Sequence, residues 1–315
     1  TTVSSHRQAL AVDAVKRGIE AYDLRHGWRG VEAKGKPLTD FVPVGNLLPA
    51  QVTKVAPKSI EVRLQSGDSV TLPWRAMDWA GRYYSADRVG GGYASPAQMV
   101  EVGDIVRIRP QNDGKSWKLA QLPRVQGQLI ALDPTNGAIE AVVGGYDFAQ
   151  SKFNRSIQGW RQPGSTIKPL MALAGLEYGI VNRNSGVFCP GFFRLPGSSH
   201  RFHDWKRGGH GSVGMDRAIA QSCDVYFYNL ALNLGIDRMH EFLDRFSMGR
   251  PTGVDLPGEK GALLPSDEWK RKTQKQPWFA GDSLSAGIGQ GYFLATPLQL
   301  AHAVAVISQQ GRNFK

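Results

Sequence analysis

One short segment constrains this chain most: residues 161–169, which read RQPGSTIKP. Its Pro-Gly pair breaks the preceding structure. The apolar run that follows, at residues 170–176, ends near Gly179 and is typical of a buried helix. Ser165 and Lys168 lie three positions apart, on one helical face. The segment therefore predicts a buried helix whose first turn brings a lysine amine within reach of a serine hydroxyl.

This pairing has a chemical meaning. A serine hydroxyl alone is a weak nucleophile, and a desolvated, neutral lysine beside it can take its proton. An isolated Ser-x-x-Lys match also fits an ordinary pair, in which Ser165 caps the helix and Lys168 lies on its surface. The Pro-Gly break and the buried helix favour the catalytic interpretation, with Ser165 as the nucleophile of an acyl transfer.

A second motif, Ser-Cys-Asp, stands at residues 222–224, directly before an apolar helix predicted at residues 225–234. Alone, Asp224 could simply cap that helix. With both motifs, the sequence resembles the transpeptidase domain of the penicillin-binding proteins, which cross-link bacterial peptidoglycan. The resemblance implies an α+β, β-lactamase-like fold, truncated here, with an all-β OB-like barrel inserted.

The resemblance is to two classes of this family. From Ser165 onward it is to the class B penicillin-binding protein 2 of rod-shaped Gram-negative bacteria, carried by KPL at 168–170, CPG at 189–191, HDWK at 203–206, SCD at 222–224 and GIGQGY at 287–292. Before Ser165 it is to the class A bifunctional penicillin-binding protein 1a, carried by YDLRHG at 22–27, GGYDF at 144–148 and SKFNR at 151–155. The change falls near residues 161–168, so we interpret the chain as a hybrid, made artificially, by recombination or by assembly.

The resemblance implies a serine-type D,D-transpeptidase that needs no cofactor for catalysis. Ser165 would attack the D-Ala-D-Ala carbonyl of a stem peptide and pass the acyl group to an amine of a second stem, and β-lactams would acylate the same serine. Ser222 would relay a proton between Lys168 and the leaving amine, and Asp224 would orient donors by hydrogen bonds. Asp224 replaces the Asn that is commoner in class A, in agreement with penicillin-binding protein 2.

The family's third motif, Lys-Thr-Gly or Lys-Ser-Gly on a strand lining the site, occurs nowhere in the sequence, since Lys115-Ser116 is followed by Trp117. Removing a single oxyanion-hole donor typically costs about 10²–10³ in rate, so we expect the chain as written to be a poor catalyst. Two rival functions stay open. One is a non-catalytic envelope scaffold or binding module. The other is a β-lactamase, which needs a general base for deacylation that the sequence does not identify.

Composition bounds the location and the partners. The sequence has no run of eighteen apolar residues and no signal peptide, and it begins at Thr1 rather than Met. We expect a periplasmic piece of a protein whose inner-membrane anchor and glycosyltransferase domain lie outside it. The net charge of +11 permits contact with polyanions, but the basic residues are scattered apart from a short run at 270–275, as on a solvated surface. The expected partners are stem peptides, β-lactams and envelope or elongation-complex proteins.

The division into domains follows changes of pattern. Residues 1–46 are predicted to hold the start of the transpeptidase region, with a helix at 4–22, and a connector. Residues 47–122 alternate as short strands and resemble the OB-like insertion of penicillin-binding protein 1a. OB barrels often bind single-stranded nucleic acid on aromatic platforms, but we assign the aromatic residues here to core packing or protein docking and predict no nucleic-acid partner; they are Trp74, Trp79, Tyr83 and Tyr84.

Residues 123–315 are predicted to form the transpeptidase domain. An Asn-Gly turn between apolar runs predicts a hairpin at 128–143, against which the Ser165 helix would pack. Further helices are predicted at 236–246 and 297–309. The glycine-dense stretch at 287–291 is not a phosphate-binding loop, because no strand precedes it and no Lys-Ser/Thr follows.

The last prediction is a structural zinc site. Its ligands would be Cys189, Asp204, His210 and Cys223, whose thiolate, carboxylate and imidazole groups suit Zn²⁺. The spacings match no zinc-finger pattern, but some members of penicillin-binding protein 2 carry a zinc site in this segment, with Asp where Cys189 stands. Such a site would pin the loop at 182–214 against the turn that holds Ser222. A Cys189–Cys223 disulfide, worth about 3–4 kcal/mol, and two unconnected thiols remain alternatives.

Overall fold

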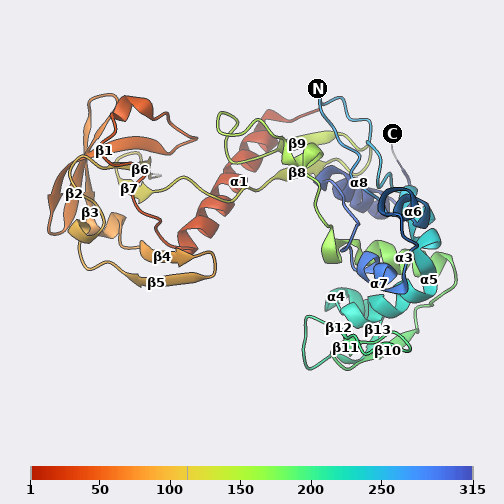
Figure 1. Cartoon of the computed structure of the whole chain (residues 1–315). Helices are drawn as coiled ribbons and strands as arrows, with labels where there is room; N and C mark the ends of the chain where they lie inside the picture. Colours follow the sequence, from red (N-terminus) through yellow and green to blue (C-terminus); the bar gives the residue numbers. More distant parts are fainter. Residues whose placement is uncertain (1, 112, 314–315) are drawn as a thin grey trace. The chain divides into compact units, whose positions relative to one another are not determined.

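The computed structural model describes residues 2–111 and 113–313 (Figure 1). The chain divides into two compact units. One, the β unit, comprises Ser5–Gln128 and Val143–Phe153. The other, the mixed unit, comprises Thr1–Ser4, Leu129–Val142 and Asn154–Lys315. Among the described residues no helix combines the length and the apolar character that crossing a membrane requires.

The β unit is built on an antiparallel sheet with the strand order β3-β2-β1-β6-β7. These strands are β1 (Leu48–Ala56), β2 (Ser59–Leu64), β3 (Ser69–Pro73), β6 (Ile105–Pro110) and β7 (Trp117–Ala120). The two edge strands, β3 and β7, also contact each other, so the sheet curls towards a barrel. The predicted alternation is confirmed in β2, where Ile60 and Val62 are buried in the core while Arg63 is exposed. It is wrong in β6, where Arg107 is buried together with its apolar neighbours.

Shorter elements complete the β unit. They are the hairpin of β4 (Gly81–Ser85) with β5 (Arg88–Gly92) and the 3-10 turns η1 (Leu38–Asp40), η2 (Trp74–Ala76) and η3 (Pro96–Gln98). Trp79, predicted to be a core or docking residue, is partly buried against the apolar core of this unit and donates its indole N–H to the Leu119 carbonyl at 3.1 Å.

The predicted N-terminal helix is confirmed as α1 (Ser5–Arg25), which belongs to the β unit. Charge pairs hold it there. The Asp23 carboxylate, only 3% exposed, accepts two hydrogen bonds from the Arg29 guanidinium, each 2.8 Å long, and buried Glu20 pairs with Arg109. The sequence prediction groups residues 1–46 with the transpeptidase region, whereas the contacts group α1 with the sheet.

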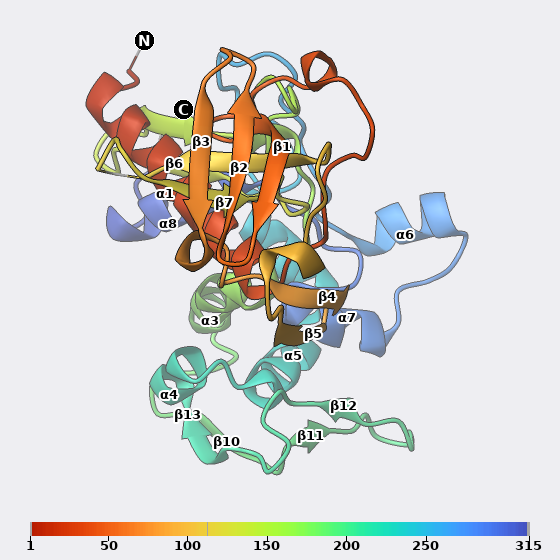
Figure 2. The same cartoon turned by 90° about the vertical axis from the view of Figure 1, so that its left-hand side faces the viewer.

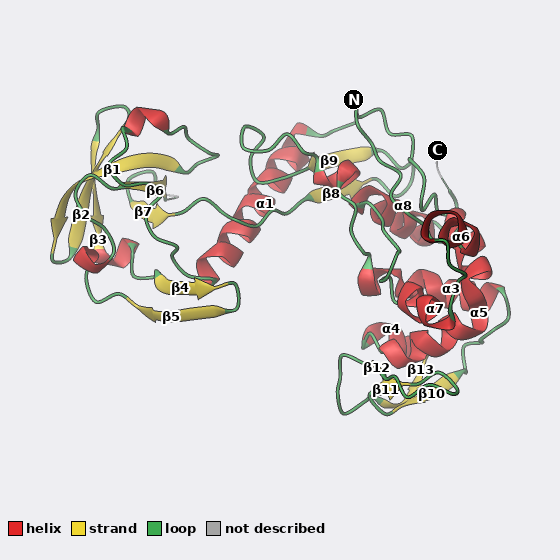
Figure 3. Ribbon diagram, viewed as in Figure 1, coloured by secondary structure: helices red, strands yellow, loops and turns green. Residues whose placement is uncertain are grey.

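The mixed unit is mainly helical (Figure 3). Its helices are α2 (Arg155–Gln158), α3 (Lys168–Glu177), α4 (Met215–Ala220), α5 (Asp224–Asp244), α6 (Asp267–Gln274), α7 (Ala280–Gly287) and α8 (Pro297–Ser308). Helix α5 is central, because α3, α4 and α7 all pack on it and its apolar residues form much of the core. Gly235 interrupts α5 with φ 73° and ψ 165°, so the two helices predicted on either side of it are its two halves.

The predicted hairpin is confirmed as β8 (Leu129–Leu132) and β9 (Ile139–Val143), which form a two-stranded sheet with Gly137 at φ 75° in the turn. The helix packed on β8 is α8, not the Ser165 helix as predicted. That helix, α3, buries Leu170 and Met171 in the core around α5 instead. Its apolar residues therefore serve helix-to-helix packing.

Two small two-stranded sheets gather beside α4 and the start of α5 (Figure 2). The first pairs β10 (Gly186–Cys189) with β13 (Gly211–Gly214), and the second pairs β11 (Phe192–Phe193) with β12 (Phe202–His203). Loops between these short strands make up much of residues 182–214, the segment that the predicted zinc site would fix against the turn that holds Ser222. The mixture of separate helical and sheet elements is the predicted α+β class.

Candidate active site

Ser165 lies in a short 3-10 turn, η4 (Gly164–Ile167), that leads directly into α3. Gly164 opens the turn with φ 56°, a conformation that glycine adopts without steric cost. Lys168 is the first residue of α3 and is 1% exposed, whereas Ser165 is exposed. The serine hydroxyl therefore faces outward above a buried amine.

A chain of hydrogen bonds connects the predicted catalytic residues. The Lys168 amine donates to the Ser222 carbonyl at 2.9 Å, to the Ser222 hydroxyl at 3.0 Å and to the Asp224 carboxylate at 2.6 Å. The Ser222 hydroxyl donates to the Ser165 hydroxyl at 2.8 Å. The direct approach of Lys168 to Ser165 expected from their spacing is thus bridged by Ser222. The four residues come together, and their catalytic roles remain predictions.

Ser222 occupies the link between α4 and α5 with φ 55°, in the left-handed region. For a residue with a Cβ this conformation costs about 1–2 kcal/mol, and such strain tends to occur at functional sites. The strained backbone presents both the carbonyl and the hydroxyl of Ser222 to Lys168.

Asp224 is the first residue of α5, where the helix dipole favours a negative charge. Its second carboxylate oxygen accepts the backbone N–H of Trp205 at 3.2 Å. The Trp205 indole donates to the Gln221 carbonyl at 3.0 Å, although the residue is 64% exposed. Sequence alone does not predict the Trp205 donor, because any residue type can make a backbone contact. The signals that point to Trp205 are its position next to Asp204 and its place in the HDWK motif.

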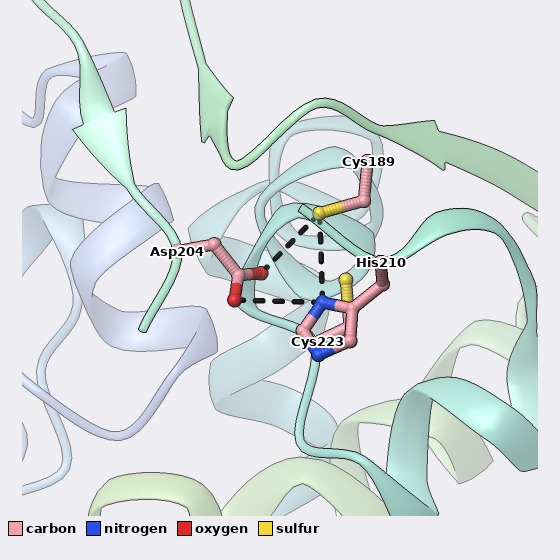
Figure 4. A group of neighbouring side chains, drawn as sticks. All are labelled: Cys189, Asp204, His210 and Cys223. Carbon is pink, nitrogen blue, oxygen red and sulfur yellow. Dashed lines mark hydrogen bonds and ion pairs between the residues drawn. The ribbon is translucent and has the colours of Figure 1, made fainter. Parts of the chain in front are cut away.

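The predicted metal ligands also come together, next to this site (Figure 4). Cys189 ends β10, Asp204 follows β12, His210 precedes β13 and Cys223 caps α5. All four are buried, and one ligand atom from each lies within 4.8 Å of the others. The two small two-stranded sheets and the start of α5 thus converge on one cluster of donor atoms.

The geometry of three of the four donors fits a small tetrahedral cation, and Cys223 Sγ lies within 4.8 Å of each of them. Cys189 Sγ is 3.5 Å from Asp204 Oδ2 and 3.6 Å from His210 Nδ1, and that nitrogen is 3.5 Å from Asp204 Oδ1. Ligands of tetrahedral zinc are about 3.3–3.8 Å apart, given Zn–N and Zn–S bonds of about 2.0–2.3 Å. His210 Nε2 is buried without a hydrogen-bond partner in the described part of the chain, so the polar contacts of this ring are those of Nδ1, which faces Cys189 and Asp204. Both cysteines are free thiols, so the alternative disulfide is not formed in this structure.

The pKa values of the Asp204 carboxyl and the Cys223 thiol are shifted. Burial alone would raise the pKa of the Asp204 carboxyl, but hydrogen bonds from the backbone N–H groups of Lys206 and Val225 outweigh it and hold the pKa below its usual value. Burial raises the pKa of the Cys223 thiol to about 12, and the neighbouring Cys189 adds to the rise. Without a cation, therefore, this thiol keeps its proton at neutral pH.

Comparison with known families agrees with this geometry. The family described as "Penicillin binding protein transpeptidase domain" matches residues 127–315, which contain the four predicted catalytic residues and the four predicted metal ligands. The chain belongs to this family. A second family, "Penicillin-binding protein OB-like domain", matches residues 17–125, which include the curled sheet and part of α1. The chain is therefore a penicillin-binding protein transpeptidase domain joined to an OB-like domain, as the motifs predict.

Relatives of both predicted kinds are found. The chain is 45% identical over 214 residues to the peptidoglycan D,D-transpeptidase MrdA of Acinetobacter baumannii, covering 61% of this chain and 32% of MrdA. It resembles the crystal structure of penicillin-binding protein 1A from Haemophilus influenzae at 30% identity and a TM-score of 0.73, over 97% of this chain and 41% of the other. It also resembles a complex of penicillin-binding protein 2 with MreC from Helicobacter pylori, at 28% identity and a TM-score of 0.55, over 65% of this chain and 47% of the other. The chain thus spans less than half of each of these relatives.

Proposed function

We propose that this penicillin-binding protein domain is a serine-type D,D-transpeptidase that works through Ser165. The supporting observation is the hydrogen-bond chain from buried Lys168 through Ser222 to the exposed Ser165 hydroxyl. Ser165 Oγ attacks the carbonyl carbon between the two D-Ala residues of a stem peptide, and D-Ala leaves as the amine. An amine of a second stem then attacks the ester, which releases Ser165 and forms the cross-link.

The proton moves along the same chain. The Ser165 proton passes to Ser222 Oγ while the Ser222 proton passes to the Lys168 amine, and the return path protonates the leaving amine. Lys168 can accept this proton only in its neutral form. The Asp224 carboxylate, 2.6 Å from the amine, is positioned to receive the proton that Lys168 must first lose. Asp224 is in turn held by the Trp205 backbone N–H.

Labelling with a fluorescent penicillin tests this function, because a β-lactam carbonyl would acylate the same oxygen. Peptide mass spectrometry should place the adduct on Ser165, and Ser165→Ala should abolish it. Thr166→Ala is a matched control, since it removes the neighbouring exposed hydroxyl and should keep the adduct. We expect slow labelling because the sequence contains no Lys-Thr-Gly or Lys-Ser-Gly. A stable adduct on another residue contradicts the assignment, no adduct favours the scaffold alternative, and rapid turnover favours a β-lactamase.

We further propose that Cys189, Asp204, His210 and Cys223 hold a structural zinc ion. When bound, zinc would supply the positive charge that keeps two buried thiolates ionised and would join the hairpin loops to the start of α5. Cys223 lies between Ser222 and Asp224, so fixing Cys223 also orients these two side chains. Metal analysis together with a thiol count should give about one zinc per chain. Absence of both metal and free thiols would instead establish the disulfide.

The biological setting is also proposed from the relatives. Peptidoglycan stem peptides would be the substrates and β-lactams the inhibitors, on the periplasmic side of the inner membrane. One solved relative is a complex of penicillin-binding protein 2 with MreC, and we infer that this chain also works with an envelope protein. A binding titration with MreC would test this inference directly.

A further inference from the structure

The glycine-dense stretch that begins at Gly287 has no part in the chemistry above, yet it lies against the turn that carries Ser165. The Gly164 N–H donates to the Gly289 carbonyl at 2.9 Å. Gln162, which precedes Gly164 by two residues, donates its side-chain amide N–H to the Gly291 carbonyl at 2.8 Å. Residues 161 and 295 exchange both of their backbone hydrogen bonds, at 3.1 and 2.9 Å. The segment at residues 287–295, here called the brace, thus follows the backbone just ahead of the nucleophile.

The approach is closest at Gly289. This residue has φ 70°, and a methyl group added there would lie 2.3 Å from the Gly164 carbonyl oxygen and 2.7 Å from the Gly164 nitrogen. Such distances are shorter than any real contact, and the obstructing atoms are backbone atoms that cannot rotate away. The two backbones therefore meet with no side chain between them, one residue away from Ser165.

The brace is itself held at several points. At its start, a methyl group added to Gly287 would lie 2.3 Å from the Ala231 side chain, so the brace rests directly on α5. Near its end, Leu294 and Leu263 exchange backbone hydrogen bonds at 2.9 and 3.2 Å. Between these points the Tyr292 ring packs edge-on against Trp269, with 5.1 Å between ring centroids. A segment anchored in this way resists displacement.

Tyr292 has a further anchor in buried Lys270. The Lys270 ammonium lies 5.6 Å from the centre of the Tyr292 ring and 4.5 Å from that of Phe279, and it forms an ion pair with Asp282. This arrangement ties the brace to both α6 and α7. Lys270 is therefore a structural residue, because its charge is neutralised by a carboxylate and surrounded by aromatic rings.

We propose that the brace positions the nucleophile: by fixing the backbone of Gly164, it keeps the Ser165 hydroxyl within hydrogen-bond distance of Ser222. This inference rests on the proposed function insofar as Ser165 is the acylated residue. Displacements of about 1 Å can cost about 100-fold in rate, so a contact through one intervening residue is close enough to matter. Gly289 is a positioning residue, since it acts through Gly164 and touches no reacting atom.

The test compares two glycine-to-alanine variants. Gly289→Ala and Gly179→Ala both place a Cβ at positive φ, 70° and 63°, but the space around Gly179 is open within 4 Å. We expect the rate constant for acylation by a fluorescent penicillin to fall about 10–100-fold in Gly289→Ala and less than about twofold in Gly179→Ala. The dissociation constant of the complex before acylation should stay unchanged in both. Gln162→Ala removes one hydrogen bond to the brace and should destabilise the fold less than either glycine variant. It should reduce the rate constant for acylation by about two- to fivefold.

A second readout does not depend on penicillin. In a Ser165→Cys background, the introduced thiol can be titrated with a soluble aromatic disulfide, whose S–S bond it cleaves to form a mixed disulfide and release an aromatic thiolate. The unmodified chain gives the background from buried Cys189 and Cys223. Adding Gly289→Ala should change the rate at least about fivefold, and adding Gly179→Ala should not.

The outcomes separate the two proposals. Equal acylation and equal thiol rates in the Gly289 and Gly179 variants overturn the brace, as does a loss in Gly289→Ala that lies entirely in the dissociation constant. A chain that never labels with penicillin, but whose introduced thiol responds to Gly289→Ala alone, refutes the proposed function and supports the brace.

Discussion

Buried charged side chains of the two units differ in whether a hydrogen-bond path leads from them to the surface. In the β unit, the Asp23 carboxylate is closed by two hydrogen bonds from Arg29, and Arg107 is paired with Glu32 and with backbone carbonyls. In the mixed unit, Asp282 closes buried Lys270 in the same way. Buried Lys168 also has a carboxylate partner, but it donates in addition to a hydroxyl that leads on to exposed Ser165. A buried charge is therefore not in itself a mark of function. The mark is a hydrogen-bond path from the charge to a reactive group at the surface.

We expect the largest effect from breaking the hydrogen-bond path between Lys168 and Ser165, and the quantity affected is the rate of acylation. Lys168→Met keeps the length of the side chain and removes its amine, so the Ser165 proton loses its acceptor and acylation should slow by about 10²–10⁴-fold. Arg29→Met, made at a closed pair, is the matched control and should leave the rate unchanged. The measurement is the rate of fluorescent penicillin labelling, with circular dichroism to verify folding. A normal rate in Lys168→Met would remove the contrast between the two units.

The donor cluster of the mixed unit should respond to metal. With free zinc about 1000-fold above the dissociation constant, binding adds about 4 kcal/mol, and chelation should lower the melting temperature by about 8–16 °C. His210→Ala should reproduce this loss and abolish zinc retention. His203→Ala, which removes an exposed histidine from the same hairpin region, should do neither. Calorimetry with metal analysis checks this, and an unchanged melting curve on chelation would argue against a structural ion.

Breaking a buried ion pair that has no hydrogen-bond path to the surface should lower the free energy of unfolding and leave the acylation rate unchanged. Arg29→Met leaves the buried Asp23 carboxylate with hydrogen bonds from Gln121 and the Arg124 N–H but without its cationic partner. This should cost about 3 kcal/mol, at the lower end of the usual range because the Arg29 side chain is 11% exposed. Adding Asp23→Leu should recover part of the loss, since an apolar pair leaves no uncompensated charge. Urea unfolding of the single and double variants measures both effects. If the double variant were less stable than Arg29→Met, the pairing argument would be wrong.

The smallest expected effect comes from a variant of the mixed unit that should lower the free energy of unfolding without changing the rate of penicillin labelling. Thr296 caps α8 through a reciprocal pair of hydrogen bonds with Gln299, and Thr296→Ala should cost about 1 kcal/mol. Because no charge or site residue changes, penicillin labelling should be unaffected. Thr273→Ala, at an exposed position in α6, is the control for stability. A slower labelling rate in Thr296→Ala would show that acylation follows the stability of this unit or the position of the brace, which ends at the preceding residue.

Short-range geometry explains what the sequence could predict of the site. Ser165 and Lys168 are joined by one helical turn, so their proximity follows from spacing, and the Asn-Gly turn alone predicts the β8–β9 hairpin. The donor cluster was predicted by residue type and by resemblance. The bridging position of Ser222 could not be predicted, because it depends on a left-handed φ of 55° that residue type does not favour.

The features that the sequence could not predict depend on contacts between residues far apart in the chain. The polar residues of α1 suggest a solvated face, but Glu20 contacts Arg109 and Tyr146, far along the chain, and is buried by them. In the same way, nothing in the glycine spacing of the brace points to Gly164. Both features depend on which segments meet in space, and no local periodicity contains that information.

The left-handed backbone of Ser222 also has an evolutionary consequence. Glycine at this position would relieve about 1 kcal/mol of strain, partly offset by its greater freedom in the unfolded chain, and would delete the hydroxyl between Lys168 and Ser165. Selection for heat resistance and selection for acylation should therefore favour different residues at position 222. In a library propagated without any demand for cell-wall synthesis, glycine should accumulate there, and restoring that demand should bring serine back.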